Sequence, residues 1–331
     1  MANFHMQIIT SMLDEAEQRQ TCAWTNNKAL QDTFCHCKAR EDIISPVPSL
    51  YIRKEYWNQL NFNNKHLYIA RALTAKHPNW IFCGPTAALA YGFEVPYWQL
   101  QKIHVTHLKS CSRENQYICH HRYIPRMKNR LQHPYISAGI PVLSTAETLA
   151  QCLRMSNFAD GLCIADSGLR TLNQTKEWLL NEVNHLGFRQ KGIAQARITA
   201  GFADARAESG GESIARAHIL ELGFASPELQ ATIIDPISKA TYRVDFLWTL
   251  PTGQRIIGEL DGRQKYVNPD MTQGRSAIDV LTAERLRESR LSRLASIMRF
   301  SFANACDLAF FYQLLQSFGV PHALQPFITR D

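Results

Sequence analysis

The sequence lacks most of the signals that mark secreted, membrane and ATP-dependent proteins. No basic segment followed by an apolar run opens the chain, so we expect no signal peptide. The longest apolar stretch, WIFCGPTAALAYGFEVP, is broken by Gly84, Pro85 and Gly92 and is too short to cross a bilayer. There is no G-x4-G-K phosphate loop, no internal repeat and no low-complexity tract. We therefore expect a soluble, cytoplasmic protein without a membrane partner.

The cysteines lack a regular framework. There are nine of them, an odd number, scattered along 331 residues, which favours reduced thiols over disulfides. A structural zinc site usually needs two matched ligand pairs. Neither the Cys35-x-Cys37 pair nor the segment from Cys111 to His121 supplies them, so the spacing predicts no zinc site.

Composition allows real hydrophobic cores. The chain is 45% apolar and 20% charged, and its length fits about two or three domains. The formal charge of +7 favours a polyanionic partner such as DNA, although proteins that bind no nucleic acid often carry a similar excess.

Three regions follow one another, and together they predict an α/β multidomain protein. Residues 1–60 predict two helices, the second capped by Thr25, and then a short β element at DIISPVPSLYI. This is the order of a winged helix-turn-helix, although any small helical cap would look similar. Residues 61–204 predict a mixed α/β domain, with strands near WIF and KIHVTHL and a capping box at Ser144 and Glu147.

Residues 205–331 have the clearest order, and Gly210-Gly211 marks their start. A helix from Glu212 is ended by Gly223. Strands follow at LQATII, YRVDFLW and QRIIGELD, then a helix near 277–294, a strand at SIMRFSF and a helix after Asn304. The predicted order is α-β-β-β-α-β-α.

Three carboxylates stand on the two central strands of this order. Asp245 precedes a short turn, and Glu259 and Asp261 follow it, so antiparallel pairing brings them close in a register that the sequence leaves open. Crowded carboxylates repel one another, and Mg²⁺ relieves this by taking oxygen ligands. The alternative is structural: Asp-Gly makes a turn, and Asp245 pairs with an arginine.

The segments RVDFLW and IIGELDGRQKY, in this order of elements, resemble the Vsr-like branch of the PD-(D/E)XK nuclease superfamily over residues 205–305. The resemblance implies a Mg²⁺ or Mn²⁺ site with Asp245 and Glu259 as ligands. It makes Asp261 a further ligand or orienting group, and Glu212 the acidic residue of the first helix. Glu212 also fits a purely structural role as the capping-box partner of Ser209.

One departure from this family concerns the residue that activates water. The lysine expected two residues after Glu259 is Asp261 here. Lys265, or Gln230 on the first strand, would have to replace it. On the helix near 277–294, Arg287 and Arg290 are candidates for phosphate contacts, or they belong to a solvated face balanced by Glu284 and Glu288.

The front of the chain resembles another family. The segments IISPVPSLYI, GPTAALAYGFEVP and GIPVLSTAETLAQC are similar to the AbiEi-type antitoxin and abortive-infection regulators over about residues 20–175. The resemblance implies a DNA-binding winged helix ahead of a mixed α/β domain. The expected DNA contacts are Asn27, Lys28, Gln31 and Arg40, in part because Asn and Gln read adenine in the major groove.

Together these features predict a metal-dependent DNA endonuclease delivered by an N-terminal DNA-binding domain, in phage defence or a toxin–antitoxin context. The alternative is a transcriptional regulator or antitoxin whose nuclease-like domain is inactive, and the missing lysine favours it. A third reading is an antitoxin that binds a toxin protein.

Overall fold

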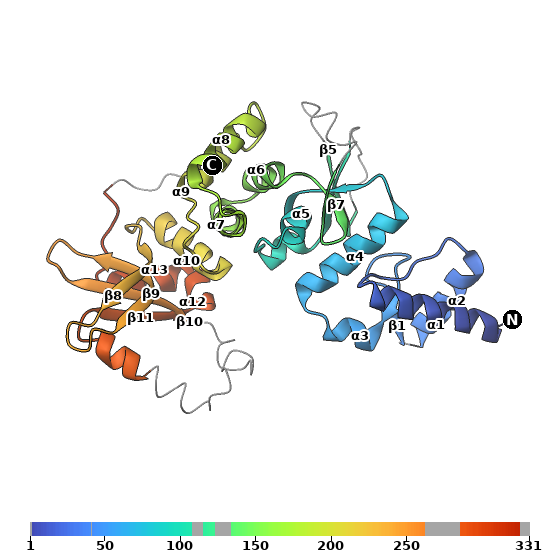
Figure 1. The fold of residues 1–331 in the computed structure, drawn as a ribbon, viewed down its shortest axis with the longest axis horizontal. Coiled ribbons are helices and arrows are strands. Elements are labelled where there is room, and N and C mark those ends of the chain that lie inside the picture. Colours follow the sequence, from blue (N-terminus) through green and yellow to red (C-terminus); the bar gives the residue numbers. More distant parts are fainter. Residues whose placement is uncertain (1, 41, 108–114, 123–133, 262–284, 325–331) are drawn as a thin grey trace. The chain divides into compact units, whose positions relative to one another are not determined.

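The structure, a computed structural model, describes residues 2–40, 42–107, 115–122, 134–261 and 285–324 (Figure 1). The chain divides into two compact units, residues 1–152 and 153–331. Helices and three sheets make up the described residues, so the predicted mixed α/β architecture is confirmed. The finer division at residues 60 and 204 stays a prediction. Within the described ranges, no helix is both long and apolar enough to span a bilayer.

The first unit opens with two helices and a small hairpin at the places that the sequence predicts. These are α1 (Ala2–Gln18), α2 (Lys28–Ala39), β1 (Ile43–Ile44) and β2 (Ile52–Arg53). The two strands pair antiparallel. The predicted cap of α2 was wrong. Asn27 caps this helix by accepting the backbone N–H groups of Ala29 and Leu30, and the Thr25 hydroxyl accepts the N–H of Asn27.

A five-stranded sheet forms the rest of the first unit, in the order β5-β4-β3-β7-β6. Its strands are β3 (Ile81–Phe82), β4 (Ile103–His107), β5 (Ile118–Arg122), β6 (Tyr135–Ser137) and β7 (Ile140–Val142). Its helices are α3 (Lys54–Gln59), α4 (Phe62–Lys76), α5 (Gly84–Ala90), η1 (Tyr97–Leu100) and α6 (Thr145–Met155). The capping box at α6 is confirmed, because Ser144 and Glu147 exchange hydrogen bonds.

The second unit begins with helices and then forms a four-stranded sheet in the order β11-β10-β9-β8, which two further helices follow in the chain (Figure 1). Its helices are α7 (Phe158–Leu172), α8 (Lys176–Gly187), α9 (Ile193–Phe202), α10 (Gly210–Glu221), α12 (Phe302–Cys306) and α13 (Leu308–Ser317). Its strands are β8 (Glu228–Ile234), β9 (Thr241–Thr249), β10 (Arg255–Asp261) and β11 (Ser296–Ser301).

The strands follow one another in the predicted order, and β9 and β10 form the predicted antiparallel pair. β8, β9 and β10 pair antiparallel, and β11 pairs parallel to β10. A helix over residues 285–291 precedes β11; the part of the predicted helix before residue 285 lies outside the described residues. Gly223, in the left-handed region at φ 82°, follows the C-cap of α10 as predicted.

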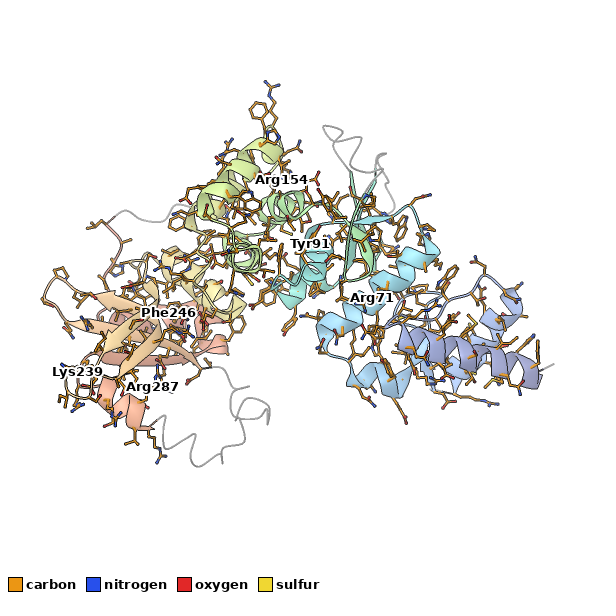
Figure 2. All side chains as sticks on the ribbon, viewed as in Figure 1. Arg71, Tyr91, Arg154, Lys239, Phe246 and Arg287 are labelled. Carbon is orange, nitrogen blue, oxygen red and sulfur yellow. The ribbon has the colours of Figure 1, made fainter. Side chains whose placement is uncertain are left out.

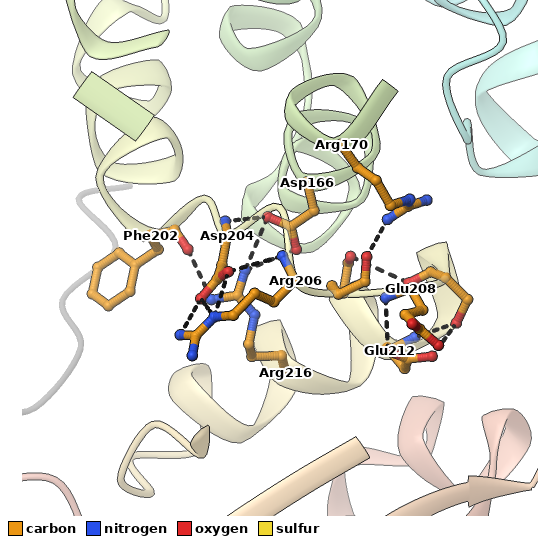
Figure 3. A network of polar contacts seen from close by, with 11 residues as sticks. Asp166, Arg170, Phe202, Asp204, Arg206, Glu208, Glu212 and Arg216 are labelled. Carbon is orange, nitrogen blue, oxygen red and sulfur yellow. Dashed lines mark hydrogen bonds and ion pairs between the residues drawn. The ribbon is translucent and has the colours of Figure 1, made fainter. Parts of the chain in front are cut away.

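A buried ion pair fixes α10 against α7. Arg216 donates two hydrogen bonds to the Asp166 carboxylate, at 2.8 and 3.0 Å, and a third to the carbonyl of Phe202 (Figure 3). The side chains are 4% and 0% exposed. Asp166 also accepts the backbone N–H of Asp204. Burial raises the pKa of Asp166, and the guanidinium of Arg216 acts against that rise.

We predict that Arg216→Met lowers the unfolding free energy of this unit by about 3–5 kcal/mol, because it leaves the Asp166 carboxylate buried without its countercharge. Urea unfolding followed by circular dichroism measures the loss. The matched control is Arg206→Met, which removes an exposed partner of Asp204 in the same network and should cost less than about 1 kcal/mol. Equal losses in both variants would contradict a special role for the buried pair.

Candidate functional site

The predicted carboxylates lie where the pairing of β9 and β10 ends. The ladder runs from Arg255 opposite Thr249 to Gly258 opposite Phe246. Glu259 and Asp245 are the next residues on the two strands. Beyond the ladder, the Asp245 carboxylate accepts the backbone N–H of Leu260 at 3.0 Å. The side chain of Asp245 therefore takes the place of a backbone acceptor and joins the two strands.

The regular alternation of side chains breaks at the same level. Leu229 packs in one hydrophobic cluster and Ala231 in the other, although residues two apart on a regular strand share a face. Between them, Gln230 adopts a left-handed backbone with φ 52°. This conformation costs a residue other than glycine about 1–2 kcal/mol. Backbone strain of this kind is concentrated at functional sites.

The amide of Gln230 links two of the carboxylates. It donates to Glu212 at 3.0 Å and to Asp245 at 3.3 Å. Glu212 is buried at the start of α10, and burial is the main cause of its raised pKa, to which the charge of Asp245 adds. Glu212 also accepts the Ser209 hydroxyl and the backbone N–H of Glu208. It therefore has both roles that the sequence allows, as a helix cap and as a member of the carboxylate cluster.

Two arginines neutralise Glu259. Arg287 contacts both of its carboxylate oxygens, at 2.5 and 3.0 Å, from the helix beside the sheet that contains Phe246 (Figure 2). Arg299 stands opposite Glu259 on β11 and reaches the carboxylate at 3.6 Å. The more exposed Asp261 lies 3.5 Å from Arg299. Sequence reasoning missed Arg299. For Arg287 it offered a phosphate contact or a solvated helix face, and did not foresee the pair with Glu259.

The donor set suits a hard cation in type, because Mg²⁺ prefers carboxylate oxygens and needs only one or two of them. The three carboxylates are farther apart, however, than the ligands of a formed metal centre. Among the residues that the structure describes, the carboxylates of Asp245, Glu259 and Asp261 do not gather within 4.8 Å of one another. Lys265, the candidate that would replace the family lysine, lies outside the described residues.

The predicted DNA-contact residues have different surroundings. The Asn27 side chain caps α2, and the Gln31 amide donates to the carbonyl of Thr25 at 2.8 Å. Lys28 and Arg40 are exposed at opposite ends of α2. In the second unit, Arg290 donates to the hydroxyl of Tyr242 at 3.1 Å. Asn27 and Gln31 thus already serve the local fold, and phosphate contacts by the exposed Lys28 and Arg40 stay a prediction.

One group of side chains that could hold a metal ion includes Cys119 and His121, from a segment in which the spacing predicted no zinc site. The ligand atoms of His104, Cys119 and His121 lie within 4.8 Å of one another in the five-stranded sheet. The sequence signal was Cys-x-His on a strand, which places both side chains on one face. The third member comes from the neighbouring strand, and only the strand register identifies it.

We predict that Gln230→Gly is more stable than Gln230→Ala by about 0.5–1 kcal/mol. Both remove the amide between Glu212 and Asp245, but only glycine adopts the left-handed backbone without steric cost. Urea unfolding measures the difference. As a control, Ala231→Gly should be destabilising, because Ala231 is the next residue of β8 and pairs regularly with Val244. An alanine variant at position 230 as stable as the glycine variant would contradict the assigned strain.

Comparison with known proteins supplies relatives but no activity. No family model matches the chain, and no solved structure matches it. Two uncharacterized proteins of Mycobacterium tuberculosis, one from each of two strains, are 29% identical to it over 189 residues, which is 57% of this chain. The match covers 65% of their length, so the chain spans less than two thirds of these curated relatives.

Proposed function

We propose that residues 205–331 form a metal-dependent DNA endonuclease of the PD-(D/E)XK type. The order of elements supports this: α10, the antiparallel strands β8, β9 and β10, a helix, and β11 parallel to β10. The PD-(D/E)XK resemblance implies the same order. Because one fold serves many functions, the proposal depends on the side chains at the strand ends.

The observation that carries the proposal is the convergence of Glu212, Gln230 and Asp245 at one break in the sheet. They come from a helix and two strands, and hydrogen bonds join them at 3.0 and 3.3 Å. Glu259 lies just beyond, next to the residue whose N–H Asp245 accepts. A sheet interior normally holds apolar side chains, whereas here Glu259 is buried and Asp245 is partly buried, beside the strained backbone of Gln230.

The chain's own residues have defined parts in this proposal. Asp245 and Glu259 would hold the Mg²⁺ or Mn²⁺ ion, which when bound supplies Lewis-acid polarisation of the phosphodiester and a water of lowered pKa. Gln230, with both a donor and an acceptor on its amide, orients the attacking water in place of the missing lysine. Glu212 holds Gln230 in position.

Arg287 occupies the Glu259 carboxylate in this structure, and we regard this pair as the state of the site before DNA binds. Its bidentate pair with Glu259 has the geometry that a guanidinium also forms with a phosphate. We infer that an incoming DNA phosphate would take Arg287 away from Glu259, which would leave the carboxylate available to hold the metal. Metal binding and DNA binding would therefore support each other.

The first unit would deliver the enzyme to DNA. The two helices and the hairpin formed by β1 and β2 have the order of a winged helix-turn-helix, and the resemblance to AbiEi-type regulators implies the same. Lys28 and Arg40, exposed on α2, are the residues we propose to contact phosphates.

A second candidate function is a DNA-binding regulator or antitoxin with an inactive nuclease-like domain. The pairing of Glu259 with Arg287 and Arg299 favours it, because two guanidinium groups already neutralise the carboxylate without a metal. A protein of this kind would bind DNA, or a toxin partner, and show no turnover.

Cleavage of supercoiled plasmid and single-stranded DNA in Mg²⁺, Mn²⁺ or EDTA tests the proposal. We predict metal-dependent cutting by the wild-type protein. Asp245→Asn and Glu259→Gln each lower the rate by at least about 100-fold, because an uncharged amide binds the cation poorly. Glu228→Gln, at an exposed carboxylate on β8, is the matched control and keeps the wild-type rate.

Two outcomes would count against the nuclease. Full activity in both site variants would remove the assignment of Asp245 and Glu259. Absence of cutting by the wild-type protein on either substrate in either metal would favour the regulator.

We also predict that Arg287→Met tightens Mn²⁺ binding about 2–5-fold, because a partly exposed ion pair of about 0.5–1 kcal/mol no longer occupies Glu259. The same variant should weaken DNA binding and reduce its salt dependence by about one phosphate contact. Calorimetry and salt titrations measure the two effects. Arg290→Met, which removes the partner of Tyr242, should leave Mn²⁺ affinity unchanged; an equal gain there would contradict the exchange.

A further inference from the structure

We propose that His104, Cys119 and His121 form a metal-binding site on the five-stranded sheet of the first unit. The ion that these ligands favour is Zn²⁺. Their ligand atoms lie within 4.8 Å of one another. The site does not depend on the nuclease proposal, because all three residues belong to residues 1–152.

The register of two parallel strands brings the three side chains together. His104 on β4 pairs with Cys119 on β5, and Thr106 pairs with His121. Paired residues share a face, and so do residues two apart. Ile103, Val105 and Ile118 point the other way, into the hydrophobic core. The three candidate ligands therefore share the face of the sheet opposite this core.

The nitrogens of the two imidazoles are already nearly as far apart as two ligands of one metal ion. His104 Nδ1 lies 2.9 Å from His121 Nε2. Two nitrogens on one tetrahedral zinc ion, each bonded at about 2.0–2.1 Å, would be about 3.3 Å apart. An ion would need to separate the two nitrogens by a few tenths of an ångström and to turn the rings so that both lone pairs point at it. A bound ion would replace the present ring-to-ring hydrogen bond.

The surroundings hold His104 in the tautomer that a metal needs. Its ring hydrogen-bonds to the backbone of Gln99, and because Nδ1 faces His121 we assign this bond to Nε2. Its backbone N–H donates to the Thr86 hydroxyl at 2.9 Å, and His66 fixes Thr86 in turn. Metal-binding histidines commonly have such a carbonyl partner on the second nitrogen, which leaves the first with its lone pair.

The ligand types select the class of ion. Imidazole and thiolate ligands suit Zn²⁺ and similar ions, whereas Mg²⁺ requires oxygen. Three protein ligands with a fourth position for water or another group is the pattern of zinc sites that do chemistry or accept a further ligand. Binding converts the Cys119 thiol to a thiolate and releases its proton to solvent. His121 moves its ring proton to Nδ1, and no electron is transferred.

Zinc binding to the full-length reduced protein, measured by competition with a chromophoric chelator, tests the proposal. We expect one ion per chain in the wild type. Cys119→Ser and His121→Ala should each weaken binding at least about tenfold. With Co²⁺ as the probe, Cys119→Ser should also abolish the thiolate-to-metal charge-transfer absorption. Zn²⁺ should raise the thermal unfolding midpoint of the wild type but not of Cys119→Ser.

Two controls separate this site from other thiols and histidines. His120→Ala changes the intervening residue of β5, whose ring meets Trp80 edge-on, and Cys35→Ala removes an exposed thiol. Both should retain the ion and its absorption. Failure of the wild type to bind Zn²⁺, or undiminished binding by a folded His104→Ala/Cys119→Ser double variant, would overturn the proposal.

Discussion

The buried ion pair between Asp166 and Arg216 is the contact on which the second unit depends. It fixes α10 on α7, and Glu212 lies one turn before Arg216 in the same helix. The position of Glu212 determines where the Gln230 amide points, and that amide in turn faces Asp245. A charge pair deep in the helical layer thus determines the geometry of polar groups in the sheet.

The carboxylates of the sheet are stabilised in two different ways. An amide and a backbone N–H satisfy Asp245, whereas two guanidinium groups neutralise Glu259. The amide of Gln230 and the backbone N–H of Leu260 are uncharged donors. Arginine donors cancel the charge of Glu259. In the proposed site the two halves would therefore differ in how readily they bind a metal, and the Arg287 side chain would control that difference.

Local patterns predicted much of this fold, because hydrophobic periodicity and capping residues act within a few positions. They located the strands β8 to β11, the capping box at Ser144, the N-cap residue Ser209 and the glycine after α10. Longer-range features were not predictable. Asp166 and Arg216 are fifty positions apart, and a left-handed glutamine has no sequence signal. The contact between His104 and Cys119 depends on a parallel register that no short turn fixes.

The left-handed backbone of Gln230 also bears on aggregation through the exposed edge of the sheet. Among the described residues, β8 pairs with β9 alone, so its other side presents backbone N–H and C=O groups that a strand of another copy could pair with. A residue with positive φ in the middle of β8 interrupts that row, in the way that a bulge does. Relaxing position 230 to an ordinary extended backbone would lengthen the uninterrupted edge and favour aggregation during folding.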